Sequence, residues 1–424
     1  MLTGESVTDV EYRRACDVWK VFKCKTIGDY SDIYLKSDVL LLADVFENFR
    51  KLCLDTYKLD PAHYITSPGL AWDALLKSTG ESLELITDVT QLQFIERGIR
   101  GGIVHCSHRH AVANNKYMKN YDCSKEDSFI AYFDVNNLYG WAMMQYLPVG
   151  KFKWLNEDQV HAFDVTSVSD EADVGYILEV DLKHPKHCHA LHQDLPLCPE
   201  KMKSPKSNSK APPRLMCALY NKSRYVIHYR NLKQCLSLGL EVIKIHRILS
   251  FSQKAWMKPY IEINTMKRAK ATNDFEKNFF KLMNNSTFGK TMQNVRKMRD
   301  VRLTTSWYGR YGAASLIAQP NFKKRIIFDE SLVAIEMAKI SILFDKPIAV
   351  GMAILDISKT CMYNFHYNYM LKKYSPEIVK MCYTDTDSFV YHISTKDLYE
   401  DIKPDISNMF DTSGYMFNNR SYER

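Results

Sequence analysis

Two aspartates separated by one residue, Asp385 and Asp387, are the side chains of this chain best suited to metal chemistry. They stand between the apolar runs 378–382 and 389–393, a pattern typical of a β-hairpin with the carboxylates at its tip. Because side chains alternate along a strand, both carboxylates can point to the same side. Paired carboxylates are ligands that Mg²⁺ prefers, and two such ions roughly 4 Å apart serve in-line phosphoryl displacement. An isolated Asp-Thr-Asp is more often an exposed acidic turn. Whether this one is a metal site therefore depends on the rest of the sequence.

A third carboxylate, Asp134, ends the β-type run 129–133 and precedes a turn and an expected helix through Met143 and Met144. An aspartate at the end of a buried strand is well placed to hold a metal. Tyr139 follows about one turn later, where its ring can form the floor of a nucleotide pocket or pack in an ordinary core. These positions predict a metal site built from two distant segments.

Between these segments lies an expected amphipathic helix, capped by Asn273 with Glu276 as its capping-box partner. One face carries Lys277, Lys281, Asn285 and Phe288, and the other carries Phe275, Phe279, Leu282 and Met283. Lysines four residues apart repel each other unless an anion lies between them, and a triphosphate would supply that anion. The alternative is a solvated basic face, which is common on such helices.

Basic residues gather around this helix, although the net charge of the 424-residue chain is only +8. Between residues 267 and 302 the acidic side chains are only Asp274, Glu276 and Asp300, among many lysines and arginines. Such clustering suits a polyanionic partner better than a uniformly mixed surface. The length predicts two or three domains.

The cysteine pattern favours an intracellular protein. Eleven cysteines without a Cys-x-x-Cys pair are typical of reduced thiols in the nucleus or cytoplasm. The sequence shows no secretory signal and no apolar run long enough to span a bilayer. We therefore expect a protein that is not secreted and has no membrane partner.

A loop rich in histidine and cysteine is a second candidate metal site. Zinc sites use such ligands at paired, regular spacings, but three prolines interrupt this segment. The zinc interpretation is accordingly the weakest one considered. The candidate ligands are His184, His187, Cys188, His189, His192 and Cys198.

In their order along the chain, the three segments resemble the motifs of family B DNA polymerases. Residues 134–139, Asp-Val-Asn-Asn-Leu-Tyr, resemble the first palm motif. Residues 281–289, Lys-Leu-Met-Asn-Asn-Ser-Thr-Phe-Gly, resemble the fingers motif, and 383–388, Tyr-Thr-Asp-Thr-Asp-Ser, the second palm motif. The chain is most similar to the protein-primed, type-2 subfamily of phages, linear plasmids, and eukaryotic self-replicating DNA transposons and viruses. Residues 354–359 resemble the eukaryotic mobile-element branch.

The resemblance implies an α+β fold, in which an antiparallel palm sheet carries the carboxylates beside helical fingers. The expected order is the helical end of an exonuclease domain over 1–95, linker and first palm segment over 96–150, palm with an insertion over 151–250, fingers over 251–305, and second palm segment over 306–424. Tyr34 and Asp38 resemble the last exonuclease motif, and without the preceding acidic motifs they are interpreted as a relic. The exonuclease motifs are incomplete and no thumb is found after the last palm motif, so both ends are expected to be truncated.

The resemblance also implies roles for single residues. Asp134 and Asp387, with the Val135 carbonyl, would hold two Mg²⁺ ions or Mn²⁺, and Asp385 would be a neighbouring catalytic carboxylate. The residues expected to bind the nucleotide are Lys281, Lys277, Asn285, Val135 and the steric gate Tyr139, which would exclude a ribose 2′-hydroxyl. The residues expected to bind DNA are Arg100, Gly101, Gly102, Gly289, Lys290 and Tyr383.

These implied features predict a DNA-directed DNA polymerase core that transfers a nucleotide from a dNTP to a primer 3′-hydroxyl. Its expected role is replication of a mobile element or virus, with primer-template DNA, dNTPs and a terminal-protein primer as partners. The alternative is a truncated, catalytically impaired nucleic-acid-binding remnant of such an enzyme. The sequence departs from the family pattern at Asn137, Gly140, Phe288 and Thr384. None of these departures removes a metal ligand, so they bear on the fidelity of DNA synthesis more than on its chemistry.

Overall fold

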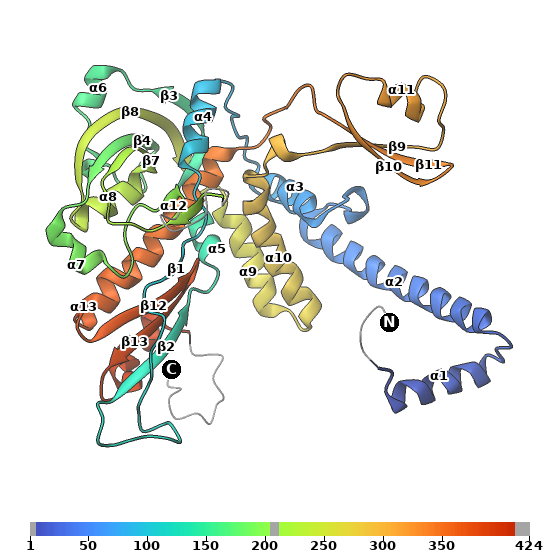
Figure 1. The fold of residues 1–424 in the computed structure, drawn as a ribbon, viewed down its shortest axis with the longest axis horizontal. Helices are drawn as coiled ribbons and strands as arrows, with labels where there is room; N and C mark the ends of the chain where they lie inside the picture. Colours follow the sequence, from blue (N-terminus) through green and yellow to red (C-terminus); the bar gives the residue numbers. More distant parts are fainter. Residues whose placement is uncertain (1–5, 204–211, 412–424) are drawn as a thin grey trace. The chain divides into compact units, whose positions relative to one another are not determined.

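The computed structural model describes residues 6–203 and 212–411 of the chain (Figure 1). The chain divides into two compact units, Met1–Ser78 and Thr79–Arg424. Within the described ranges, the first unit is helical and the second combines helices with antiparallel sheets. The expected α+β class is therefore confirmed.

The first unit is built from α1 (Asp9–Val21), α2 (Ile27–Tyr57) and α3 (Ser67–Thr79). A capping box starts α2, because the Thr26 side chain accepts from the Asp29 amide while the Asp29 side chain accepts from the Thr26 amide. Tyr34 and Asp38, four residues apart, lie on one face of α2. No group of three or more His, Cys, Asp or Glu suited to a metal occurs in the described part of the chain, and so none surrounds Asp38.

The carboxylate-bearing strands form one four-stranded antiparallel sheet in the order β1-β12-β13-β2. Its strands are β1 (Val104–Cys106), β2 (Ser128–Asp134), β12 (Val379–Asp385) and β13 (Ser388–Ser394). Phe389, Tyr391 and Ile393 of β13 are buried, and as alternate residues they lie on one face of the strand. Because β13 pairs with both β12 and β2, two segments about 250 residues apart in sequence meet in this sheet.

A second four-stranded antiparallel sheet has the order β3-β8-β4-β7 and lies at the upper left in Figure 1. Its strands are β3 (Leu147–Trp154), β4 (Val174–Lys183), β7 (Lys222–His228) and β8 (Glu241–Lys254). A short ladder joins β5 (Glu200–Met202) to β6 (Arg214–Met216). Most of this sheet falls in the part of the chain expected to hold an insertion in the palm.

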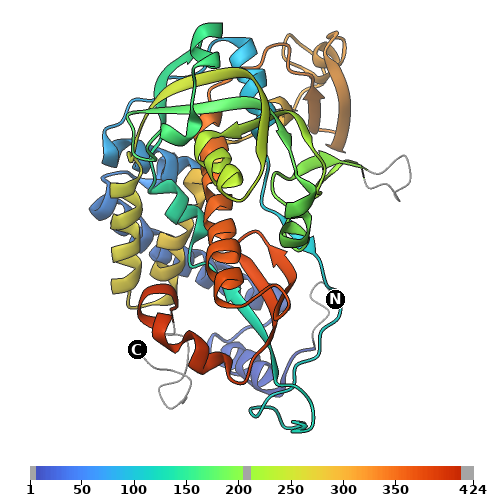
Figure 2. The same ribbon diagram turned by 90° about the vertical axis from the view of Figure 1, so that its left-hand side faces the viewer.

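Helix α12 (Ile348–Tyr363) runs between the two four-stranded sheets (Figures 1 and 2). It is apolar around most of its circumference, which predicts a buried helix, and nearly all of its side chains are buried. It packs against α4 (Val89–Gly98), α5 (Leu138–Met143) and α8 (Tyr229–Ser237). The shorter helices of this unit are α6 (Glu157–His161), α7 (His189–His192), α11 (Ala313–Ile317), α13 (Leu371–Lys373), α14 (Leu398–Ile402) and α15 (Ile406–Met409).

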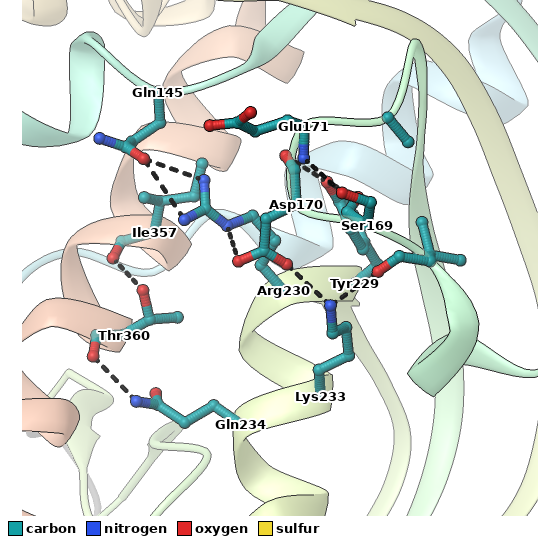
Figure 3. A network of polar contacts seen from close by, with 12 residues as sticks. Gln145, Ser169, Asp170, Glu171, Tyr229, Arg230, Lys233, Gln234, Ile357 and Thr360 are labelled. Atoms are coloured by element: carbon teal, nitrogen blue, oxygen red, sulfur yellow. Dashed lines mark hydrogen bonds and ion pairs between the residues drawn. The ribbon is translucent and has the colours of Figure 1, made fainter. Parts of the chain in front are cut away.

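A network of ion pairs and hydrogen bonds connects α8 to the end of α5 and to α12 (Figure 3). The Arg230 guanidinium lies 3.0 Å from Asp170 and donates to the Gln145 side chain just beyond α5. One helical turn later, Gln234 donates to the Thr360 carbonyl of α12 at 2.9 Å. The network thereby connects α8 both to a residue just beyond α5 and to α12.

The predicted basic helix is α10 (Asp274–Thr291), and it packs against α9 (Lys258–Lys270). The Asn273 side chain accepts from the Glu276 amide at 2.9 Å, so the helix starts at its predicted cap. A buried bond from Asn264 to Asn284, 2.7 Å long, links the two helices. Both helices fall within 251–305, the range expected to form the fingers.

A three-stranded sheet follows the helical pair and corrects one expected boundary. It consists of β9 (Asp300–Thr304), β10 (Phe322–Asp329) and β11 (Leu332–Met337), in the order β10-β11-β9. The boundary placed at residue 305 therefore falls inside a sheet, because β9 pairs with β11 across it.

The boundary expected at residue 95 also differs from the structure, which divides the chain after Ser78. Helix α4 belongs to the second unit, because its Phe94 and Ile95 are buried in one cluster with Leu249 and Met352. No helix in the described ranges is long and apolar enough to cross a membrane.

Candidate active site

The tip of the β12–β13 hairpin separates the two neighbouring aspartates. Asp385 is the last residue of β12 and pairs with Ser388, which leaves Thr386 and Asp387 as the two turn residues. Thr386 has a left-handed backbone with φ of 60°. The expected hairpin is confirmed, but strand alternation does not apply to Asp387, because it lies in the turn.

The turn brings Asp387 next to Asp134. Asp134 is directly opposite Ser388 in the β13–β2 register, and the Val135 amide donates to the Asp387 carbonyl at 2.8 Å. Burial and the negative charge of Asp134 raise the pKa of Asp387 above its usual range. A cation between these carboxylates would relieve their repulsion.

Asp134 and Asp387 line a cavity of about 700 Å³, a volume typical of a ligand site. Its wall comes from the turn after β2, from the hairpin tip, and from helices α5, α9 and α10. Among the residues predicted to be functional, the lining includes Asp134, Val135, Tyr139, Lys277, Lys281, Asn285 and Asp387.

The oxygen donors near Asp134 and Asp387 suit a Mg²⁺ ion that takes only some of its ligands from the protein. No group of three or more His, Cys, Asp or Glu suited to a metal is present in the described ranges. The candidate donors are therefore Asp134, Asp387 and the Val135 carbonyl, while Asp411, which also lines the cavity, accepts from the Asn136 side chain. Mg²⁺ is commonly bound by one or two carboxylates together with substrate phosphates and waters. Asp385 is exposed and outside the cavity lining, where its carboxylate accepts from the Tyr383 hydroxyl at 3.3 Å.

Cations of α9 and α10 line the same cavity as the carboxylates. Lys277 and Lys281 both line it, and the positive charge of Lys281 opposes the raised pKa of Asp387. Arg268 of α9 lines the same cavity and was missed from the sequence. The basic run 267–270 was its signal, but only the packing of α9 on α10 shows which of these residues faces inward.

Tyr139 stacks on Phe288, with ring centroids 4.4 Å apart and planes 15° apart. Burial, and then the charge of Asp387, raise the pKa of Tyr139. A Cβ at Gly140 would overlap the Asn137 side chain, so these two departures from the family pattern accommodate each other. Tyr139 lines the cavity together with Asp134 and Asp387, and its ring is supported by Phe288.

The residues expected to bind DNA lie outside the cavity lining. The Arg100 side chain is only 8% exposed, and its guanidinium donates to the Val226 carbonyl at 2.7 Å and lies over the Tyr225 ring. The expected DNA contact of this side chain is therefore corrected, because its partners lie inside the protein. A Cβ at Gly102 would overlap the Thr386 side chain, so this glycine allows close packing against the hairpin.

The other four residues expected to contact DNA are more accessible than Arg100. Open space surrounds the Cβ positions of Gly101 and Gly289. Lys290, in the last turn of α10, is partly buried. Tyr383 is 36% exposed, on β12. None of these positions prevents the expected DNA contact.

The histidine-rich loop contains a buried histidine pair in place of a zinc centre. His184 Nε2 and His192 Nδ1 are 2.8 Å apart, a direct hydrogen bond that leaves no room for a metal between these atoms. Burial lowers the pKa of both side chains to about 4. The zinc interpretation is therefore replaced by two uncharged, hydrogen-bonded rings.

We expect this buried pair to make the fold sensitive to acid. The pKa of His192 is near 6.5 in an unfolded chain and about 4 in the folded one, so its stabilising effect is complete above pH 6.5 and lost as the pH falls towards 4. A difference of roughly 2.5 units corresponds to about 3 kcal/mol of unfolding free energy. At pH 5, about 1.5 units below the unfolded pKa, roughly 2 kcal/mol should already be lost, and urea titrations at pH 7 and pH 5 measure this difference. His192→Leu should reduce it, whereas His110→Leu, at an exposed position, should not.

Comparison with known proteins shows which family shares these features. The family model of DNA polymerase type B, organellar and viral, matches residues 22–370. Among curated proteins, none matches the chain significantly. The range 22–370 contains Asp134 and α10, and it ends before the hairpin that bears Asp387.

Solved structures of Phi29 DNA polymerase resemble the chain in fold. The orthorhombic crystal form is 14% identical over 94% of this chain and 56% of that chain, with a TM-score of 0.50. The ternary complex with primer-template DNA and incoming nucleotide substrates has the same identity and coverage, with a TM-score of 0.48. The chain thus spans little more than half the length of these proteins.

Proposed function

Since the chain belongs to the family of organellar and viral DNA polymerases of type B, we propose that its second unit catalyses DNA-directed DNA synthesis. The reaction is attack of a primer 3′-hydroxyl on the α-phosphate of a dNTP. It forms a phosphodiester bond and releases pyrophosphate. This proposal includes replication of a mobile element or virus as the biological role.

One observation carries the proposal: a single cavity is lined by two palm carboxylates and by three cations of α9 and α10. The carboxylates are Asp134 and Asp387, and the cations are Lys277, Lys281 and Arg268. Cations can bind the phosphates of an anionic substrate, and carboxylates in the same cavity can hold metal ions at the reacting atoms. A general DNA-binding surface would need the cations without the paired carboxylates.

The residues of the cavity have separate proposed tasks. Asp134, Asp387 and the Val135 carbonyl would hold two Mg²⁺ or Mn²⁺ ions, which, when bound, stabilise charge on the attacking and leaving oxygens. Lys281, with Lys277, would bind the triphosphate through charge-assisted hydrogen bonds. Tyr139 would exclude a ribose 2′-hydroxyl, and Asn285 would lie beside the new base pair. Asp385, outside the cavity lining, would act only through its charge on Asp387.

The proposed partners are primer-template DNA, dNTPs and a terminal-protein primer. Support for DNA and nucleotide comes from the family, and support for the terminal protein from the resemblance to protein-primed enzymes. Of the expected DNA contacts, Gly289, Lys290 and Tyr383 are retained in this proposal, together with the backbone at Gly101. An intracellular location is proposed with them, since these partners occur inside cells.

Extension of a short labelled primer by the purified chain tests the proposal. The assay uses Mg²⁺ at low salt, because phosphate contacts weaken as salt rises. We expect template-dependent addition of the complementary nucleotide. Binding of primer-template without any incorporation would contradict this function and favour the alternative, a nucleic-acid-binding remnant.

A further inference from the structure

A buried lysine of α12, Lys359, contributes a cation beneath the hairpin but does not line the large cavity. It is 5% exposed, and its ammonium donates to the carbonyls of Arg100 and Leu355, each at 2.9 Å. Asp356 lies 3.8 Å from the ammonium and also accepts from the His228 amide at 2.9 Å. A buried charge is costly unless paired and hydrogen-bonded, and these contacts supply both conditions.

The carbonyl held by Lys359 begins the segment on which the hairpin turn rests, residues 100–103. The Ile103 carbonyl accepts from the Thr386 amide at 2.8 Å. Gly102 packs so closely on the Thr386 side chain that a Cβ would overlap it. Thr386 directly precedes Asp387, so a displacement of this segment would displace the turn.

The contact between α12 and the turn has almost no free space. A cavity of about 10 Å³, the size of a single water, lies between them and is lined by Lys359, Tyr363, Gly102 and Thr386 among others. The Tyr363 hydroxyl is buried without a hydrogen-bond partner in the described residues. Close packing of this kind transmits small shifts instead of absorbing them.

We propose that Lys359 is a positioning residue for the active site. Through the Arg100 carbonyl it holds segment 100–103, and through that segment it sets the position of Asp387 beside Asp134. The bond from the Val135 amide to the Asp387 carbonyl fixes the turn from the other side. This inference rests on the proposed polymerase function for its effect on rate, but its effect on the turn is independent of that function.

Hydrogen exchange tests the effect on the turn without any enzymatic assay. Lys359→Met keeps the apolar stem and removes the donors, so the Thr386 amide should exchange at least about tenfold faster. The matched control is Lys222→Met, because Lys222 is also buried and donates to the Glu200 carboxylate and the Ala218 carbonyl far from the hairpin in sequence. The control should leave exchange at Thr386 unchanged. Equal protection of this amide in wild type and Lys359→Met would overturn the inference.

Steady-state kinetics of primer extension tests the effect on rate. We expect Lys359→Met to lower kcat by at least about tenfold while the KM for nucleotide changes less than about twofold, because the nucleotide contacts remain. Lys222→Met should change neither. In a double-mutant cycle, Lys359→Met and Gly102→Ala should be non-additive, because both act on the same turn. Additive effects would contradict the path through segment 100–103.

The test still gives an answer if the Lys359 variant does not fold or if the wild type shows no activity. If Lys359→Met fails to fold, the double variant Lys359→Met with Asp356→Asn removes the unpaired buried carboxylate and takes its place. A wild-type chain that extends no primer contradicts the proposed function, and hydrogen exchange then still tests the positioning. An active wild type with unchanged exchange and unchanged kcat in the Lys359 variants overturns the positioning alone.

Discussion

Replacing Asp387 by asparagine is expected to slow primer extension at saturating nucleotide by about 10³-fold, the scale of losing one group that stabilises transition-state charge. Asparagine has nearly the same volume as aspartate but lacks the charge that a Mg²⁺ ligand supplies. Asp387 lines the cavity beside Asp134, whereas the third lining carboxylate, Asp411, accepts from the Asn136 side chain at 2.7 Å. Single-turnover extension with rapid quenching measures this rate directly.

The same substitution should slightly stabilise the protein at pH 7. Burial and the charge of Asp134 raise the pKa of Asp387, so the ionised carboxylate is disfavoured in the folded state. Loss of rate together with unchanged or increased resistance to urea would separate catalysis from folding. Asp385→Asn is the matched control, and it should lower the rate about tenfold or less, because Asp385 is outside the cavity lining and its proposed action is through its charge on Asp387. Equal losses in both variants would contradict the different roles proposed for them.

Replacing Lys281 by alanine is expected to raise the KM for nucleotide by about 10- to 100-fold, which corresponds to one charge-assisted hydrogen bond. Lys281 and Asp387 line the same cavity, and the positive charge of Lys281 acts on Asp387. The affinity for primer-template should change little, since the triphosphate is the proposed partner of this side chain. Steady-state extension at varied nucleotide, with DNA binding measured separately, distinguishes the two effects.

Lys290→Ala provides the matched control on the same helix. Lys290 lies in the last turn of α10 and is not in the cavity lining, so its proposed partner is the DNA backbone. We expect weaker DNA binding with a shallower salt dependence, and an unchanged KM for nucleotide. If Lys281→Ala and Lys290→Ala weaken DNA binding equally, then α10 is a general DNA-contact surface.

Much of the local structure around the site could be predicted from periodicity and capping. The apolar runs on either side of residues 383–388 predicted the hairpin, and the Asn273 cap predicted the start of α10. These features depend on residues close together in sequence. The confirmed α+β class and antiparallel palm sheet were implied by the motifs and their order.

Other features of the site could not be read locally. The sequence alone did not reveal that Arg268 faces the cavity, because that depends on how α9 packs on α10. Arg100 was expected to contact DNA, but its partners on β7 are more than a hundred residues away in sequence. The division of tasks between Asp385 and Asp387 depends on a two-residue turn, which places one in the strand and the other outside it.

Sequence by itself therefore specified the chemical groups, their order and the elements that carry them, because propensity, capping and alternation act over a few residues. Only the tertiary structure decided that Asp134 lies opposite Ser388 and beside Asp387. Strand register between distant segments is selected by burial of whole faces and by contacts of high sequence separation, which no local pattern records. The contact of Lys359 with the Arg100 carbonyl, across 259 residues, arises in the same way.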